Sequence, residues 1–300
     1  MRNTNSLFTR IRFLKTARKR LETRHFKRAK VQSYLLRAAV YLAAAVTAGV
    51  LLFVVGYILV KGVPNLTWSL FEWKYNSENV SLMPALLNTL LMTLLALSIS
   101  VPLGVSAAIY LVEYARRGSK LVRVIRMNAE TLSGIPSIVY GLFGMLFFVN
   151  TLKLGLSMLS GALTLSIMIL PLILRTAEEA LLSVPDSFRE GSFGLGAGRL
   201  RTVFRVVLPD AVPGILAGVI LGVGRIVGET AALIYTAGTS SDTVSGLFDS
   251  ARTLSVHMYA LSQEGLYLNQ TYATAVVLLI IVIGINALSS LLAKRVGRRL

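Results

Sequence analysis

The chain contains 300 residues, of which 54% are apolar and only 15% charged, and its mean hydropathy is +0.67. Average proteins carry about 25% charged residues, so this composition excludes an ordinary soluble domain. The chain has no cysteine, which excludes disulfides and thiolate metal sites. The formal net charge of +17 suggests a nucleic-acid partner at first, and the distribution of that charge decides against it.

The positive charges gather at alternate connections between apolar segments. Of the 31 Lys and Arg residues, 26 lie in four stretches: 2–37, 116–126, 175–205 and 294–299. Cytosolic loops of membrane proteins carry such an excess, whereas loops on the opposite side do not. The pattern therefore predicts a multi-pass membrane protein with both termini in the cytosol and no nucleic-acid partner.

Six apolar segments are long enough to be considered as membrane spans. A hydrocarbon core roughly 30 Å thick requires about 20 apolar residues in a helix. The predicted spans are Tyr34–Val60, Pro84–Val112, Thr131–Val149, Gly161–Leu174, Val212–Ala237 and Tyr272–Ala293. The predicted fold class is thus an all-α polytopic protein with six transmembrane helices. Small residues and Pro136 near the start of the third span predict a local bend there.

The remaining segments complete the predicted organisation. Residues 1–33 form a basic cytosolic arm, 61–83 a periplasmic loop, 84–293 a core of five helices, and 294–300 a basic cytosolic tail. In the arm, Leu7, Phe8, Ile11 and Leu14 recur at helical spacing. This spacing favours either a helix on anionic lipid headgroups or a solvated tail that only fixes topology.

A charged loop rich in glycine, residues 176–210, connects the fourth and fifth spans. Glu190 is followed six residues later by Gly196, and Leu208-Pro209 comes twelve residues after that glycine. The spacing predicts a short helix from Glu190 to Gly196, a glycine turn, and a second amphipathic stretch that begins at Arg199 and ends at Leu208-Pro209. Such a helix could transmit force from a partner; the alternative is a connector without one.

Two pairs of opposite charges occur at helical i,i+4 spacing. Arg225 and Glu229 are predicted to share one helix face near the middle of the membrane. An intramembrane charge costs at least ~2.5–3.5 kcal/mol, so such residues face a protein interior or a watery cavity. The pair is interpreted as lining an anion path or as a static buried pair. Arg175 and Glu179, at the cytosolic end of the fourth span, form a gate or an ordinary interfacial pair.

Other polar and small residues have simpler interpretations. Gly214, Gly218 and Gly222 recur every four residues, which favours close helix packing. Asn88 and His257 are isolated and are interpreted as structural residues. The chain has no G-x-x-x-x-G-K-[ST] phosphate loop and no H-E-x-x-H or G-x-S-x-G motif, so no catalytic residue, metal site or enzymatic activity is predicted.

The motifs resemble those of a known family. The spacing of Glu190, Gly196 and Leu208-Pro209 is similar to the EAA loop of type I ABC importer permeases. PSIVYG (136–141), RTAEEAL (175–181) and R-x-x-G-E-T-A (225–231) resemble permeases of the phosphate-specific transport (Pst) system. GETAALIYTAG followed by TLSVHMYAL looks more like the A-type (PstA-like) permease than the C-type. The resemblance extends from about Pro84 to the end of the last span.

The resemblance implies an inner-membrane phosphate permease with the type I ABC importer fold. Its partners would be a homologous C-type permease, a periplasmic phosphate-binding protein and an ATPase dimer; ATP and Mg²⁺ would bind that ATPase, leaving this chain without a cofactor. The implied substrate pathway contains Arg225 and Glu229, with Arg175 and Glu179 as weaker candidates. The implied ATPase-coupling residues are Glu190, Gly191, Ser192, Gly196, Arg199, Leu208 and Pro209.

Some residues depart from the family pattern, and other functions stay open. Gly191-Ser192 replaces two alanines, Asp210 a small apolar residue, and Ser255 a proline. The alternatives are a permease for phosphonate, sulfate or molybdate, a membrane scaffold or signalling subunit without transport, and a secondary transporter or channel that needs no ATPase.

Overall fold

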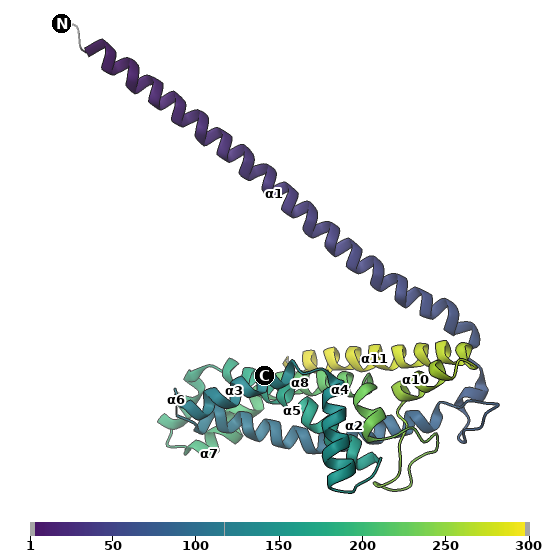
Figure 1. Cartoon of the computed structure of the whole chain (residues 1–300). Coiled ribbons are helices and arrows are strands. Elements are labelled where there is room, and N and C mark those ends of the chain that lie inside the picture. The colour runs from purple at the N-terminus through teal and green to yellow at the C-terminus, as the bar shows by residue number, and fades with distance from the viewer. Residues whose placement is uncertain (1–3, 117, 298–300) are drawn as a thin grey trace. The chain divides into compact units, whose positions relative to one another are not determined.

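The computed structural model describes residues 4–116 and 118–297, and side chains within 33–116, 118–287 and 291 (Figure 1). The described residues form helices and no strands. The helices are α1 Thr4–Gly62, α2 Met83–Ile109, α3 Lys120–Ser133, α4 Ser137–Gly144, α5 Met158–Ser183, α6 Asp186–Gly194, α7 Arg199–Thr202, α8 Leu208–Val227, α9 Ala231–Thr236, α10 Leu254–Glu264 and α11 Leu268–Gly297. Two compact units divide at Tyr57 and Ile58, and each is described by itself.

The first unit consists of α1 as far as Tyr57. The predicted first span is confirmed, because residues 33–65 have the length and hydropathy to cross a membrane. Apolar side chains such as Leu42 and Phe53 are exposed, as expected for a helix surrounded by lipid. Helix α1 already begins at Thr4; the proposed lipid-facing side chains of the arm lie outside the described residues.

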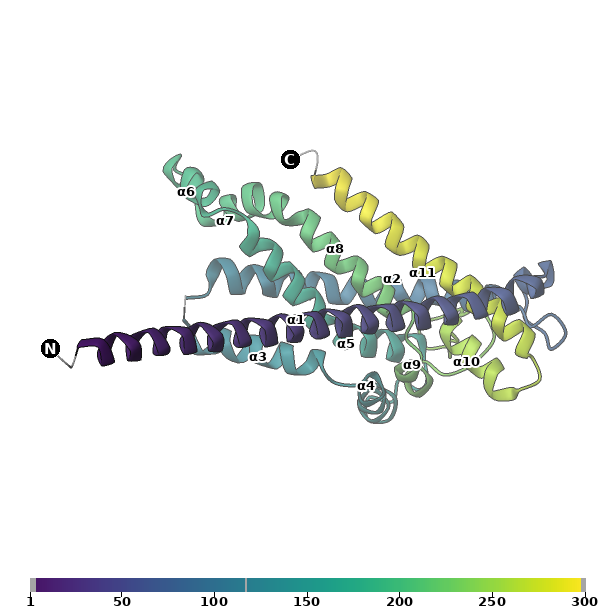
Figure 2. The same cartoon turned by 90° about the horizontal axis from the view of Figure 1, so that it is seen from above.

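The second unit is built around α5, which packs between α2 and α8, with α11 against α8 (Figure 2). The spans Met83–Tyr114, Met158–Ser183 and Leu268–Ala287 confirm three further predicted crossings. The fourth span is longer than predicted at both ends, since α5 starts before Gly161 and continues past Leu174. Buried apolar side chains of α2, α5 and α8 form the interior of the second unit.

Three glycines on one face of α8 permit the close packing that their spacing predicted. A Cβ atom on Gly214 would lie 2.7 Å from Ala180 Cβ, and one on Gly218 would lie 2.0 Å from Thr176 Oγ1. The corresponding atom on Gly222 would approach Ile173 of α5 to 3.3 Å. The helices therefore approach more closely than any larger residue at Gly214 or Gly218 would permit.

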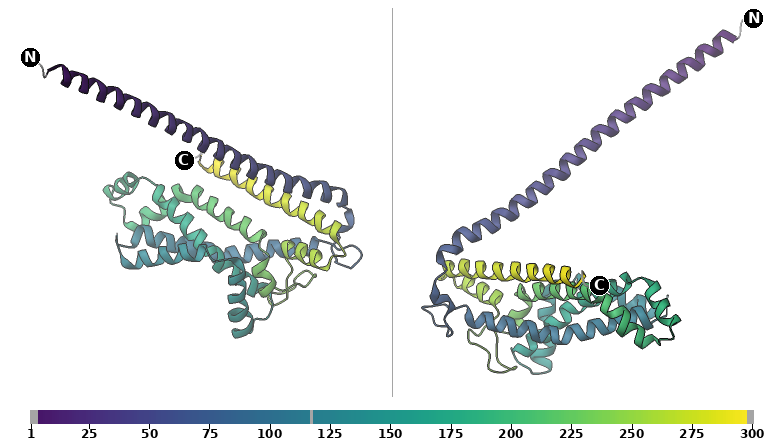
Figure 3. Two further views of the ribbon diagram at one scale, coloured as in Figure 1. Left: turned by 45° about the horizontal axis from the view of Figure 1, so that its top comes forward. Right: turned by 180° about the vertical axis from the view of Figure 1, so that it is seen from behind.

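The third predicted span, Thr131–Val149, is bent sharply near its start. Helix α3 ends at Ser133, and the helical segment Ser137–Thr151 starts after a bend of 102°. Proline at position 136 and Gly134 at the end of α3 explain the break, because neither favours a continuous helix. The predicted local bend is thus confirmed, and it is much sharper than a kink. Figure 3 shows α3 running along the bundle and α4 projecting from it.

The fifth predicted span, Val212–Ala237, is wrong at both ends. Helical structure begins at Arg199 and continues to Val227, and the chain then breaks before the short helix α9. Leu208-Pro209 does not interrupt it: Pro209 occupies the beginning of α8, after a π-helical turn from Val203 to Val207, and proline is tolerated at that position.

The loop between α9 and α10 is attached to α2 by Asn88. The Asn88 amide donates to the carbonyl oxygens of Asp242 (3.0 Å) and Arg252 (3.3 Å), and its oxygen accepts from the Val244 N–H (3.1 Å). Thr89 Oγ1 accepts from the Leu254 N–H at 2.8 Å. The interpretation of Asn88 as a structural residue is confirmed.

Candidate functional site

The loop that contains Glu190 forms two short helices at one end of the second unit, far from α10 (Figure 1). Helix α6 contains Glu190, Gly191 and Ser192, and begins one turn earlier than predicted. Asp186 lies in its first turn, where a carboxylate is favoured by the helix dipole. A short helix is therefore present as predicted, but it ends at Gly194, and Glu190 lies near its centre.

Gly196 terminates α6. Its φ of +82° lies in the left-handed region that glycine adopts without strain. The Ala197 N–H donates to the Ser192 carbonyl at 3.1 Å, which closes the helix end as in a Schellman motif. The glycine turn predicted from the spacing is thus confirmed, and Arg199 begins α7 directly after it.

The loop exposes three large apolar side chains. Phe188 and Phe193 are 49% and 44% exposed, and Leu195 at the turn is 92% exposed. Glu190, which lies between the two phenylalanines in sequence, is also exposed. Exposed apolar residues grouped on one short element are typical of a surface that binds another protein.

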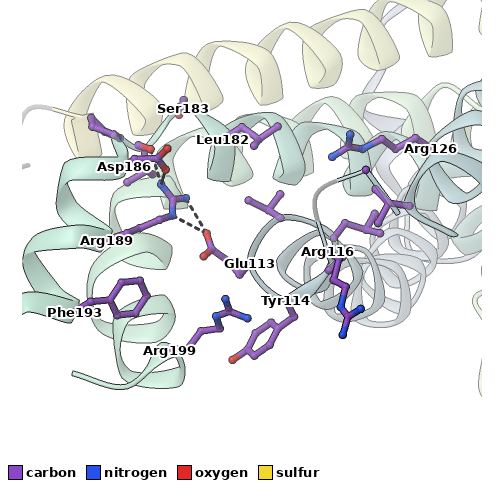
Figure 4. A pocket seen from close by; sticks show the side chains of 17 residues that line it. Glu113, Tyr114, Arg116, Arg126, Leu182, Ser183, Asp186, Arg189, Phe193 and Arg199 are labelled. Atoms are coloured by element: carbon purple, nitrogen blue, oxygen red, sulfur yellow. Dashed lines mark hydrogen bonds and ion pairs between the residues drawn. The ribbon is translucent and has the colours of Figure 1, made fainter. Parts of the chain in front are cut away.

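Arg189 points towards the end of α5 and the end of α2 and fixes α6 to them (Figure 4). Its Nε and Nη2 donate to Glu113 Oε1 at 3.1 and 2.8 Å. Its Nη1 and Nη2 donate to the carbonyl oxygens of Val184 (2.7 Å) and Leu181 (2.9 Å). The Arg189 and Glu113 side chains are 13% and 7% exposed. Sequence reasoning missed this pair, although Glu113 is an acid at the end of an apolar segment.

A cavity of about 800 Å³ lies beside this pair, between α6, α3 and the end of α2 (Figure 4). Arg116, Arg126, Arg189 and Arg199 line it, together with Glu113 and Asp186. Arg199 lies over the Tyr114 ring, with Cζ 5.8 Å from the ring centre, which attaches α7 to the end of α2.

A second cavity, of about 620 Å³, lies between α3, α5 and α8. Its charged lining residues are Arg126, Glu130, Arg175, Glu178, Glu179 and Arg225. Arg126 forms an ion pair with Glu178, and Arg175 Nε is 3.1 Å from Glu179 Oε1. The predicted Arg175–Glu179 pair is therefore present, and both side chains are more than 60% exposed. Arg225 brings a further positive charge to the same cavity.

Glu229 does not share a helix face with Arg225, so that prediction is wrong. Helix α8 ends at Val227, and Glu229 lies in the break before α9. Its Oε1 accepts from the Ala232 N–H at 3.0 Å, which caps α9, and the residue is 9% exposed. Within the described side chains no ion pair joins it to Arg225. Gly228 explains the break, since glycine weakens a helix and is common where one ends.

Of the four residues predicted to line the substrate pathway, Arg175, Glu179 and Arg225 line this one cavity. Glu229 does not line it. Among the described residues no group of three His, Asp or Glu side chains is arranged to hold a metal ion. The second unit combines several candidate spans with an exposed helical loop and a charged cavity between the spans. This organisation is typical of a membrane transport subunit.

The chain belongs to the family described as inner membrane components of binding-protein-dependent transport systems, whose model matches residues 100–300. Members of this family are permease subunits of ABC importers, and they work with an ATPase and a substrate-binding protein. Such permease components are generally non-catalytic and span the membrane several times.

Similar proteins support the same assignment. The chain is 34% identical to the probable ABC transporter permease YqgI of Bacillus subtilis, covering 79% of this chain and 85% of that protein. It is 34% identical to the phosphate transport system permease PstA 1 of Mycobacterium tuberculosis, and the alignment covers 72% of this chain and 71% of that protein. The MetNI methionine ABC transporter, solved in inward-facing conformations, is 20% identical with a TM-score of 0.54, covering 81% and 97%. These findings confirm the predicted type I ABC importer permease fold.

Proposed function

We propose that this chain is the A-type permease subunit of an ATP-driven importer of inorganic phosphate in a bacterial inner membrane. The observation that carries the proposal is the relationship to phosphate transport permeases over about 70% of both chains. The charged cavity that contains Arg225 is a second support, because a phosphate anion requires compensating positive charge inside a membrane protein.

The homologous C-type permease completes the pathway, and a periplasmic binding protein delivers phosphate to it. ATP and Mg²⁺ bind the ATPase dimer, because this chain has no phosphate-binding loop of its own. Both termini lie in the cytosol, which the positions of the Lys and Arg residues favour. That orientation places α6 and α7 in the cytosol, where the ATPase is.

Transport proceeds by alternating access. Closure of the ATPase dimer on ATP draws the α6 helices together and opens the helix interface to the outside; hydrolysis resets it. In this cycle the exposed Phe188, Glu190 and Phe193 contact the ATPase, and Gly196 gives the loop its shape. Arg225 provides electrostatic complementarity for the anion in transit. Glu229 holds α9 in place beside the end of α8.

Uptake by the reconstituted complex tests this proposal. Proteoliposomes that contain the two permeases and the ATPase, with binding protein outside and ATP inside, should accumulate labelled phosphate. Unlabelled sulfate, molybdate or phosphonate should not compete. Competition by one of these anions would indicate that the complex transports that anion. Uptake without ATP would favour a secondary transporter. No uptake by a fully assembled complex would favour a scaffold.

A further inference from the structure

Polar contacts, with no buried apolar residue, attach α6 to the rest of the protein. Of its nine residues, all within the described part of the chain, none is buried, and all but Arg189 and Ser192 are exposed. These two lie three positions apart and therefore on one face of the helix. Ser192 Oγ is 2.9 Å from Thr202 Oγ1 of α7, and Arg189 contacts α5 and the end of α2.

Arg189 joins three segments through one guanidinium group. Two of its contacts are carbonyl oxygens at the end of α5, at Leu181 and Val184, where a helix has unpaired acceptors and favours positive charge. The third is the carboxylate of Glu113, 76 positions away in sequence, in the π-helical turn that ends the second span. The planar guanidinium group has donors enough for all three contacts, which a lysine ammonium cannot match in geometry.

The connection between α5 and α6 is short and not helical. Val184 and Pro185 are the two residues that separate the helices, and both have extended backbone conformations. Rotation at these residues would move α6 without moving α5 or α2. The Arg189 contacts oppose that rotation, and they are well shielded from water, which makes their loss costly.

We propose that Arg189 and Glu113 form the mechanical link through which a displacement of α6 reaches the second and fourth spans. Arg189 is thus a positioning residue for transport, distinct from the exposed residues that contact the ATPase. This inference rests on the proposed function, since it assumes an ATP-driven movement of α6. In this proposal the Arg189–Glu113 link determines the efficiency of transport, that is, the number of ATP molecules hydrolysed for each phosphate imported.

Substitutions that weaken the link test the proposal in the reconstituted complex. Glu113→Gln and Arg189→Lys should leave assembly with the ATPase intact and raise the ATP hydrolysed per phosphate several-fold, because α6 moves while the spans follow incompletely. Asp186→Asn is the matched control: Asp186 contacts the same arginine at 3.3 Å, but its side chain is 66% exposed. It should leave the ratio within error of the wild type.

A crosslink in place of the ion pair separates transmission from simple stability. The chain has no cysteine, so Glu113→Cys with Arg189→Cys introduces a single reactive pair in this subunit. The reduced variant should be inefficient, and a short bifunctional thiol reagent should restore the ratio. An unchanged ratio in the substituted proteins overturns the proposal, and so does a parallel fall in ATPase activity and uptake through loss of assembly. Failure of the wild-type complex to import phosphate would instead reject the proposed function.

Discussion

Arg225 is the one cation that α8 contributes to the cavity between α3, α5 and α8. Replacement by Gln removes the charge and leaves a side chain of similar length, so the subunit should still assemble. Loss of one hydrogen bond to a charged group, worth about 1.5–3 kcal/mol, predicts a fall in uptake of about ten- to a hundredfold. Labelled phosphate uptake with Arg225→Gln measures this.

The matched control is Arg123→Gln on α3, an exposed arginine that lines neither cavity. It should import phosphate at the wild-type rate. If Arg225→Gln does so as well, Arg225 has no part in the pathway.

The burial of His257 in α10 predicts that the stability of the second unit depends on pH. Its side chain is buried against Tyr75, and burial, together with the nearby Arg252 charge, lowers its pKa to about 4. The unfolded chain, with a pKa near 6.5, binds this proton more readily. Stability is therefore full above pH 6.5 and falls as pH drops towards 4, by about 2 kcal/mol at pH 5.

Thermal unfolding of the purified subunit at pH 7.5 and pH 5.0 checks this expectation. His257→Phe keeps a ring against Tyr75 and cannot bind the proton, so its melting temperature should depend less on pH than that of the wild type. Equal pH dependence in both proteins would contradict the assignment.

At the residue scale, sequence reasoning succeeded where the signal is local. The roles of Gly196, Asn88 and the glycines of α8 follow from spacing or isolation along the chain. The contact of Arg189 with Glu113 joins positions 76 residues apart, which no local pattern reveals. Glu229 was misplaced because the i,i+4 rule assumes a continuous helix, and Gly228 ends that continuity.

At the element scale, the packing of α5 against α8 depends on the absence of side chains at particular positions. An alanine at Gly218 would place Cβ 2.0 Å from Thr176 Oγ1, which is itself fixed by a 2.9 Å hydrogen bond to Leu172. Overpacking of this kind costs about 1–3 kcal/mol. Gly218→Ala should therefore lower the melting temperature of the purified subunit.

Gly224 lies on the same helix and provides the comparison. No atom lies within 4 Å of a Cβ placed there, so Gly224→Ala should stabilise the helix by about 0.5–1 kcal/mol. Equal melting temperatures for the Gly218 and Gly224 variants would show that the helices are not in close contact at Gly218.

The same scale shows why the boundaries of spans are hard to predict. Hydropathy identified all six apolar segments, but it does not report a change of direction within one. The third segment bends by 102° at Gly134–Pro136, and the fifth breaks at Gly228, both inside apolar stretches. Glycine and proline there mark the break without fixing its angle.

At the scale of the whole molecule, the fold and the family follow from the sequence, because six apolar segments, the charge distribution and the EAA-like spacing are consistent with one another. The charged cavity and the attachment of α6 required the structure. The cavity combines side chains of α3, α5 and α8, and the attachment joins Arg189 to Glu113, 76 positions away in sequence. The proposed function requires that α6 lies in the cytosol and binds the ATPase.

The most direct test places a single cysteine at Glu190 in this cysteine-free chain. In inside-out membrane vesicles of the assembled complex, a membrane-impermeant thiol reagent should label Glu190→Cys, and a short photoactivatable crosslinker there should capture the ATPase subunit. Addition of ATP should change the yield of this crosslink. Labelling confined to right-side-out vesicles, or crosslinks that reach only lipid, would contradict the account.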